Sequence, residues 1–369
     1  MLRIMSTPLL GHLDPQFLNL MNESAEMLRF AYRTKNPLTL AISATGTAGM
    51  ETCLVNLLEP KDKVAVFALG YFGQRMIDIA GRTGAEVTAV EGKWGEAFDL
   101  QLIRDTLKKV RPKVLAIVHA ETSTGVLQPG MDEIGKMCRE TDTLLVADCV
   151  TSLGCTPLEV DAWGIDAAFS CSQKGLSCPP GLSPVTFSPR AVEAMEKRKT
   201  KVQSWYLDLS LIRKYVGGTE RSYHHTAPIS MNYALHEGLR LVLEEGLEAR
   251  WARHLKHHKA LKAGLLAMGL KYTAAEGCEL PHLNAVRIPE GMDDLAGRKM
   301  MLSEFGIEIG GGLGDFKGRA WRIGLMGTNC KATSVFQCLG AMEQVLTRLG
   351  AKIPAGAGMA AANAAYAGR

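Results

Sequence analysis

Between residues 38 and 188 short apolar runs recur along the chain, and this alternation restricts the fold more than any other feature of the sequence. Most of the intervening segments have the length and periodicity of helices. Strands that alternate with helices form a mostly parallel sheet covered by helices on both faces. We therefore expect an α/β fold, with strands at Leu38–Ile42, 63–68, 86–91, 113–120, 143–149, 166–172 and 183–188.

From about residue 231 the pattern becomes mainly helical. Short strands are predicted near 283–288, 306–309 and 320–324, between helices near 293–304 and 331–349. This pattern indicates a second, smaller α+β domain. We expect three parts: a large domain over residues 1–245, a small domain over 246–355, and a loose Ala/Gly-rich tail over 356–369.

The composition excludes several classes of protein. The 42 Lys and Arg residues nearly balance the 38 Asp and Glu residues, so we expect no nucleic-acid partner. No run of about 18 apolar residues is present, so we expect no membrane span. The nine cysteines form no C-x-x-C pair, and the N-terminus MLRIMSTPLLGH lacks the apolar stretch of a signal peptide. We expect reduced thiols in a cytoplasmic protein.

Reactive side chains follow successive strands of the predicted sheet. Ligands of parallel α/β sheets bind at the carboxyl ends of the strands. The polar and aromatic residues at these ends are Thr45, Gly46, Thr47, Tyr71, Phe72, Glu121, Thr122, Ser123, Asp148, Gln173 and Lys174. Taken singly each is weak evidence, because a strand-end aspartate is usually a turn former and a loop lysine is usually solvated.

Together these residues match the needs of pyridoxal phosphate (PLP). An amine such as Lys174 holds the aldehyde as an imine, and a carboxylate such as Asp148 keeps the pyridine nitrogen protonated. The segment Thr45-Gly46-Thr47 opens a helix, whose N-terminus suits a phosphate. Phe72 is placed to stack on the ring, and Thr122 to bond its hydroxyl.

The chain resembles the class V aminotransferases of fold type I, the alanine–glyoxylate and serine–glyoxylate (serine–pyruvate) type. The motifs HAETSTGVLQP, GIDAAFSCSQKGLSCPPG, SYHHTAP and WRIGLMG carry this resemblance. It implies that Lys174 is the Schiff-base lysine, that Asp148 pairs with the pyridine nitrogen, and that Val150 packs on the ring face opposite Phe72. It further implies PLP contacts from Thr45, Gly46, Thr47, Thr122 and Gln173, and a substrate-carboxylate contact from Arg322.

The resemblance also implies a homodimer, in which Tyr223 and Thr226 complete the phosphate site of the neighbouring subunit. At two of these site positions the chain departs from the pattern. Phe72 stands where several relatives have Trp, and Thr47 stands where some have His.

We therefore expect transamination between alanine or serine and glyoxylate or pyruvate, with Lys174 moving the proton at the substrate Cα. The alternative within PLP chemistry is a lyase or desulfurase, but related desulfurases place His, not Gln173, before the lysine. A dehydrogenase would need G-x-G-x-x-G after a strand, which SATGTAGM does not supply. An inactive PLP-fold interaction protein is disfavoured by the intact Lys174, Asp148 and Arg322. The histidines at 254, 257 and 258 are expected on a solvated helix face.

Overall fold

A seven-stranded sheet forms the centre of the larger part of the molecule. The computed structural model describes residues 1–216 and 222–368. The strand order is β1–β9–β8–β7–β4–β2–β3, and only β9 runs antiparallel to its two neighbours. The predicted α/β fold with a mostly parallel sheet is confirmed. The bounds are β1 Leu38–Ile42, β2 Lys63–Ala68, β3 Glu86–Glu91, β4 Val114–Val118, β7 Leu144–Asp148, β8 Ala167–Phe169 and β9 Ser183–Phe187.

Helices cover both faces of this sheet, so the central strands are buried on both sides. Along β4, Leu115 and Ile117 belong to one hydrophobic cluster, while Val114 and Val118 belong to the other. A strand of this kind carries no polar alternation, which is why 114–118 reads as a continuous apolar run. The helices are α2 Pro15–Tyr32, α3 Gly46–Leu57, α4 Tyr71–Arg82, α5 Leu100–Val110, α6 Met131–Glu140, α7 Pro189–Glu196, α8 Leu209–Val216 and α9 Ile229–Glu245, preceded by the short α1 Leu2–Met5.

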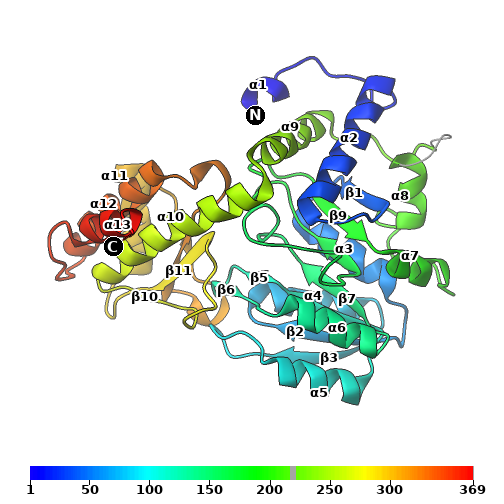
Figure 1. The fold of residues 1–369 in the computed structure, drawn as a ribbon, viewed down its shortest axis with the longest axis horizontal. Coiled ribbons are helices and arrows are strands. Elements are labelled where there is room, and N and C mark those ends of the chain that lie inside the picture. The colour runs from blue at the N-terminus through cyan, green and yellow to red at the C-terminus, as the bar shows by residue number, and fades with distance from the viewer. Residues whose placement is uncertain (217–221, 369) are drawn as a thin grey trace.

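A smaller, four-stranded antiparallel sheet of order β10–β11–β13–β12 lies at the other end of the molecule (Figure 1). Its core includes the fully buried Trp321. The predicted position of a strand near 306–309 is wrong, because the residues that pair with β13 on this side are Gly310 and Gly311. The elements are α10 Leu247–Ala267, β10 Lys271–Tyr272, β11 Leu283–Arg287, α11 Asp294–Phe305, β12 Gly310–Gly311, η1 Gly314–Phe316, β13 Ala320–Gly324, η2 Gly327–Asn329 and α12 Ala332–Arg348; a third, two-stranded sheet pairs β5 Ala120–Glu121 with β6 Val126–Leu127.

The C-terminal segment is not the loose tail that we predicted. Residues Ala357–Tyr366 form α13, which packs along α10 (Figure 1). Ala362 is fully buried, and the Tyr366 hydroxyl lies 2.7 Å from His257 Nδ1. Alanine favours helices, and its small side chain lets α13 approach α10 closely.

The expectation of a solvated histidine face on α10 is also wrong. His254 and His258 are buried, and burial lowers the pKa of His254 to about 4. The Gly327 N–H donates to His254 Nε2 at 3.1 Å, and His258 Nδ1 lies 2.7 Å from Asn284 Oδ1. These histidines therefore join α10 to the loops and strands beside it.

In the described part of the chain, no helix combines the length and apolar character needed to cross a membrane. All nine cysteines are free thiols, and eight of them are buried.

Candidate active site

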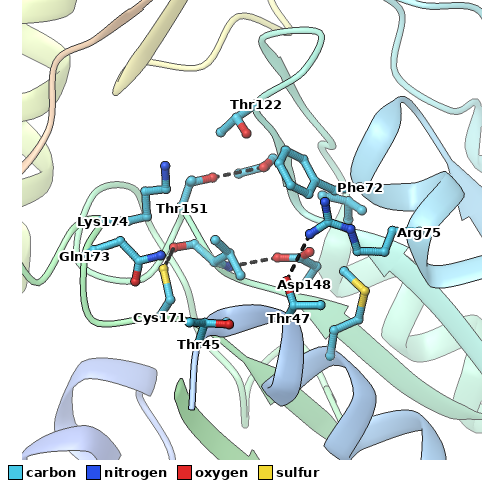
Figure 2. A pocket seen from close by; sticks show the side chains of 15 residues that line it. Thr45, Thr47, Phe72, Arg75, Thr122, Asp148, Thr151, Cys171, Gln173 and Lys174 are labelled. Carbon is cyan, nitrogen blue, oxygen red and sulfur yellow. Dashed lines mark hydrogen bonds between the residues drawn. The ribbon is translucent and has the colours of Figure 1, made fainter. Parts of the chain in front are cut away.

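A cavity of about 230 Å³ lies at the carboxyl ends of the parallel strands (Figure 2). Nine of the predicted site residues line it: Thr45, Gly46, Thr47, Phe72, Thr122, Asp148, Val150, Gln173 and Lys174. The remaining lining residues, which the sequence did not indicate, are Met50, Arg75, Val118, Ala120, Thr151 and Cys171.

The topology explains why residues so far apart in sequence meet here. Asp148 is the last residue of β7, Lys174 follows β8, and Thr45 follows β1. The strands β7 and β8 are neighbours in the sheet and run parallel. Their carboxyl ends therefore point to the same edge, as in other open α/β sheets.

The N-terminus of α3 presents free backbone donors to the cavity. Thr45 is its N-cap, but the Thr45 side chain makes no capping hydrogen bond. The first N–H groups of a helix have no partner within the helix, and the helix dipole favours an anion there. A Cβ on Gly46 would lie 2.9 Å from Cys171 Cβ, so this position requires glycine.

Asp148 and Lys174 lie on opposite sides of the cavity (Figure 2). Asp148 is buried, and its Oδ1 accepts a hydrogen bond from the Val150 N–H at 2.8 Å. Burial raises the pKa of Asp148 to about 7, partly offset by that bond and by the charge of Arg75. A cationic ring nitrogen beside this carboxylate would favour its charged form.

The loop that carries Lys174 is held by a buried arginine. Arg250, on α10, donates from Nη2 to the Gly175 carbonyl at 2.5 Å and from Nε to the Gly154 carbonyl at 2.9 Å. Its charge is paired with Glu245 at 2.5 Å. The lysine backbone is therefore braced by a helix some 75 residues further along the chain.

Glu121 holds the helix that carries Phe72. Its Oε2 accepts from the N–H groups of Phe72 and Gly73, both at 3.2 Å, and its Oε1 accepts from the N–H and hydroxyl of Ser123. Because Phe72 and Gly73 are in the first turn of α4, this carboxylate caps the helix N-terminus. The Phe72 ring is thereby kept at the cavity.

Arg322 and the two residues of the SYHHTAP motif do not line the cavity. Arg322, on β13, donates from Nε to the Gly311 carbonyl at 2.8 Å and from Nη1 to the Thr122 carbonyl at 3.4 Å, so it lies beside the cavity. Tyr223 is 63% exposed, and its hydroxyl lies 3.3 Å from Thr226 Oγ1. Neither side chain is among the residues that line this cavity.

The most informative residue that the sequence reasoning missed is Arg75. It lies one helical turn after Phe72 on the amphipathic α4, and this i, i+3 spacing was the available signal. Thr151 was missed as well; its hydroxyl donates to the Ala120 carbonyl at 2.9 Å. Among the described residues, no group of three or more His, Cys, Asp or Glu side chains is arranged to hold a metal ion.

Comparison with known proteins shows the same fold and the same family. A model of the class V aminotransferases matches residues 9–314. The solved structure of alanine–glyoxylate aminotransferase from Nostoc sp. is 51% identical, with a TM-score of 0.91, and the match covers 94% of this chain and 91% of that one.

Two further relatives extend this comparison. The structure of ureidoglycine–glyoxylate aminotransferase from Bacillus subtilis is 43% identical, with a TM-score of 0.96 over 99% of this chain and 94% of that one. The alanine–glyoxylate aminotransferase of Drosophila melanogaster is 38% identical over 95% of this chain and 90% of its own length.

The sheet and a cavity lined by an amine and a carboxylate at its strand ends define a PLP-dependent enzyme of fold type I. Within that class, the chain belongs to the class V aminotransferase family and is a PLP-dependent transaminase. The lyase or desulfurase alternative is not favoured, since the matching relatives named above are aminotransferases.

Proposed function

We propose that this transaminase moves an amino group from a small L-amino acid, alanine or serine, to glyoxylate or pyruvate. The similarity to alanine–glyoxylate aminotransferases over nearly the full chain carries this proposal.

The cavity residues fit PLP by their chemistry. The amine of Lys174 and the carboxylate of Asp148 lie on opposite sides of the cavity, and the flat ring of Phe72 lies at one wall. Backbone N–H donors without a side-chain cap lie at the start of α3. When bound, PLP supplies an aldehyde that captures amines and a ring that accepts electrons. We assign Lys174 as the residue that holds the cofactor and then carries the proton at the substrate Cα.

The other roles follow from position. Asp148 accepts the ring N–H, Phe72 and Val150 enclose the ring, and Thr122 bonds its hydroxyl. Thr45, Gly46, Thr47 and Gln173 bind the phosphate. Arg322 binds the substrate carboxylate, because a guanidinium forms two parallel hydrogen bonds to it.

We also propose a homodimer with shared active sites. The exposure of Tyr223, together with Trp205 at 64% and Tyr71 at 41%, supports this assembly, because exposed aromatic rings are typical of interfaces. In the dimer, Tyr223 and Thr226 would reach the phosphate bound by the partner subunit.

The domain division is likewise a proposal. We assign residues 1–245 to a large PLP-binding domain and the remainder, with α13 included, to a small domain. The separate hydrophobic core around Trp321 and the break between α9 and α10 at Gly246 support this division. The free thiols support a cytoplasmic location.

A second amino donor, (S)-ureidoglycine, is suggested by the Bacillus subtilis relative, which is 42% identical over 99% of this chain. The higher identity of the Nostoc protein favours alanine. A panel of half-reactions with alanine, serine and ureidoglycine, followed by glyoxylate or pyruvate, would rank these substrates. Turnover with ureidoglycine alone would contradict our choice.

The role of Lys174 is tested by the change Lys174→Ala. The variant should lose the near-visible absorbance of bound PLP and all transamination, because Lys174 is the sole amine among the cavity-lining residues that the structure describes. Lys136→Ala, on the exposed face of α6, is the control and should behave as wild type. A Lys174→Ala protein with full turnover would refute the assignment.

A further inference from the structure

Arg75 is a charged side chain of the cavity to which the proposed chemistry assigns no role. Its guanidinium lies 5.1 Å from the Phe72 ring centroid and 5.3 Å from that of Tyr71. Its Nη1 donates to Thr47 Oγ1 at 3.0 Å. Within residues 1–216 and 222–368, these contacts leave its positive charge without a carboxylate at ion-pair distance.

Arg75 and Thr47 lie beside Asp148, on the side of the cavity opposite Lys174 (Figure 2). The cavity lining contains one carboxylate, that of Asp148, and two cationic side chains, those of Arg75 and Lys174. Each cation therefore stands at a different end of the site, and the carboxylate stands with Arg75.

A positive neighbour favours the charged form of Asp148. Its pKa is raised to about 7, by burial first and also by the nearby carboxyl of Glu121, and the Val150 N–H and the charge of Arg75 keep it from rising further. A carboxylate can hold a protonated ring nitrogen only in its ionised form.

The remaining titratable groups that act on Asp148 do not supply positive charge. These groups are the thiols of Cys53, Cys149 and Cys171 and the phenol of Tyr32. Burial raises the pKa of each of them, so all four are neutral near pH 7.

We propose that Arg75 is a positioning residue of the cofactor site, whose charge keeps Asp148 ionised at the ring-nitrogen end, with Thr47 holding the guanidinium in place. This inference rests on the proposed roles of Asp148 and Lys174. A cation near the carboxylate matters because Asp148 is shielded from water.

The experiment measures the protonation of the cofactor ring in variants of Arg75. PLP labelled with nitrogen-15 in the ring is added to each apoprotein. The ring-nitrogen chemical shift and the PLP dissociation constant are then recorded near pH 7.5. Circular dichroism melting establishes that each variant is folded.

Arg75→Gln should move the ring-nitrogen resonance toward the unprotonated position and weaken PLP binding about tenfold, as expected when one opposite charge near a carboxylate is lost. Asp148→Asn gives the limiting shift. Arg75→Lys keeps the charge and should restore most of the wild-type resonance. Arg82→Gln, a surface change on the same helix where Arg82 pairs with Asp78, should match wild type.

An unchanged resonance in folded Arg75→Gln would overturn the inference, as would equal effects of the Lys and Gln variants. If the Gln variant does not fold, Thr47→Val carries the test: a partial shift in the same direction is expected, and none would contradict the proposal. Wild-type protein that forms no PLP absorbance would refute the proposed function itself. Normal wild-type binding with unaffected Arg75 variants would refute only the role of Arg75.

Discussion

At the scale of single residues, the environment of Arg322 is notable because neutral oxygens hold its guanidinium. The carbonyls of Gly311 and Thr122 orient the side chain but do not neutralise its charge. A Cβ on Gly310 would lie 3.2 Å from Arg322 Nη2, so this glycine of β12 makes room for the guanidinium. Among the described residues no carboxylate stands at ion-pair distance from Arg322, although the charge of Glu121 acts on it from further away, and an oriented cation of this kind suits an anionic substrate group.

Arg322→Lys should raise the KM for amino acids on the order of 10- to 100-fold and leave PLP affinity unchanged, since an ammonium keeps the charge but loses the second parallel hydrogen bond. Steady-state kinetics and PLP titration would measure the two effects. Arg287→Lys, an exposed position on the adjacent strand β11, is the control. Unaltered KM values in Arg322→Lys would show that the carboxylate binds elsewhere.

At the scale of elements, the start of α4 illustrates how a strand end and a helix are coupled. Glu121 accepts four hydrogen bonds, three of them from backbone N–H groups. Gly70 is required beside it, because a Cβ there would lie 2.3 Å from Ser123 Oγ. The position of the Phe72 ring therefore depends on a carboxylate located 49 residues later in the chain.

Glu121→Gln should destabilise the apoprotein by about 1–3 kcal/mol, because an amide NH₂ replaces one acceptor and faces backbone donors inside the protein. Urea unfolding at neutral pH measures this change. Glu133→Gln, a half-exposed carboxylate in the first turn of α6, should stay within about 0.5 kcal/mol of wild type. Equal stability of Glu121→Gln and wild type would remove the capping role.

At the scale of the whole molecule, the proposed dimer would link cofactor binding to assembly. PLP held by two chains stabilises the state that it binds, so its removal should loosen the association. Sedimentation of holoprotein and apoprotein over a range of concentrations would measure this. A monomer that remains fully active when dilute would exclude shared sites.

Tyr223→Phe should weaken PLP retention by about 1.5–3 kcal/mol, the value of one hydrogen bond to a charged group. Dialysis against buffer without PLP, followed by absorbance, gives the retained fraction. Tyr366→Phe, which removes a hydroxyl on α13 far from the motif in sequence, should retain PLP as wild type does. Similar losses in both variants would indicate a general destabilisation.

Much of the fold could be predicted because its signals are local. The strand 38–42 and the helix 71–82 follow from periodicity within a few residues, and the order of the motifs indicated the cavity residues. The sequence by itself thus determined the parallel sheet and which strand ends meet.

Only the tertiary structure decided how side chains far apart in sequence share an environment. Arg75 meets Asp148 across two elements, and Arg322 meets Thr122 across 200 residues, so no local pattern records either pair. Burial of His254 and of Ala362 is likewise decided by packing between α10, α13 and their neighbours. The physical reason is that charge, solvation and close packing depend on distance in space, whereas periodicity depends on distance along the chain.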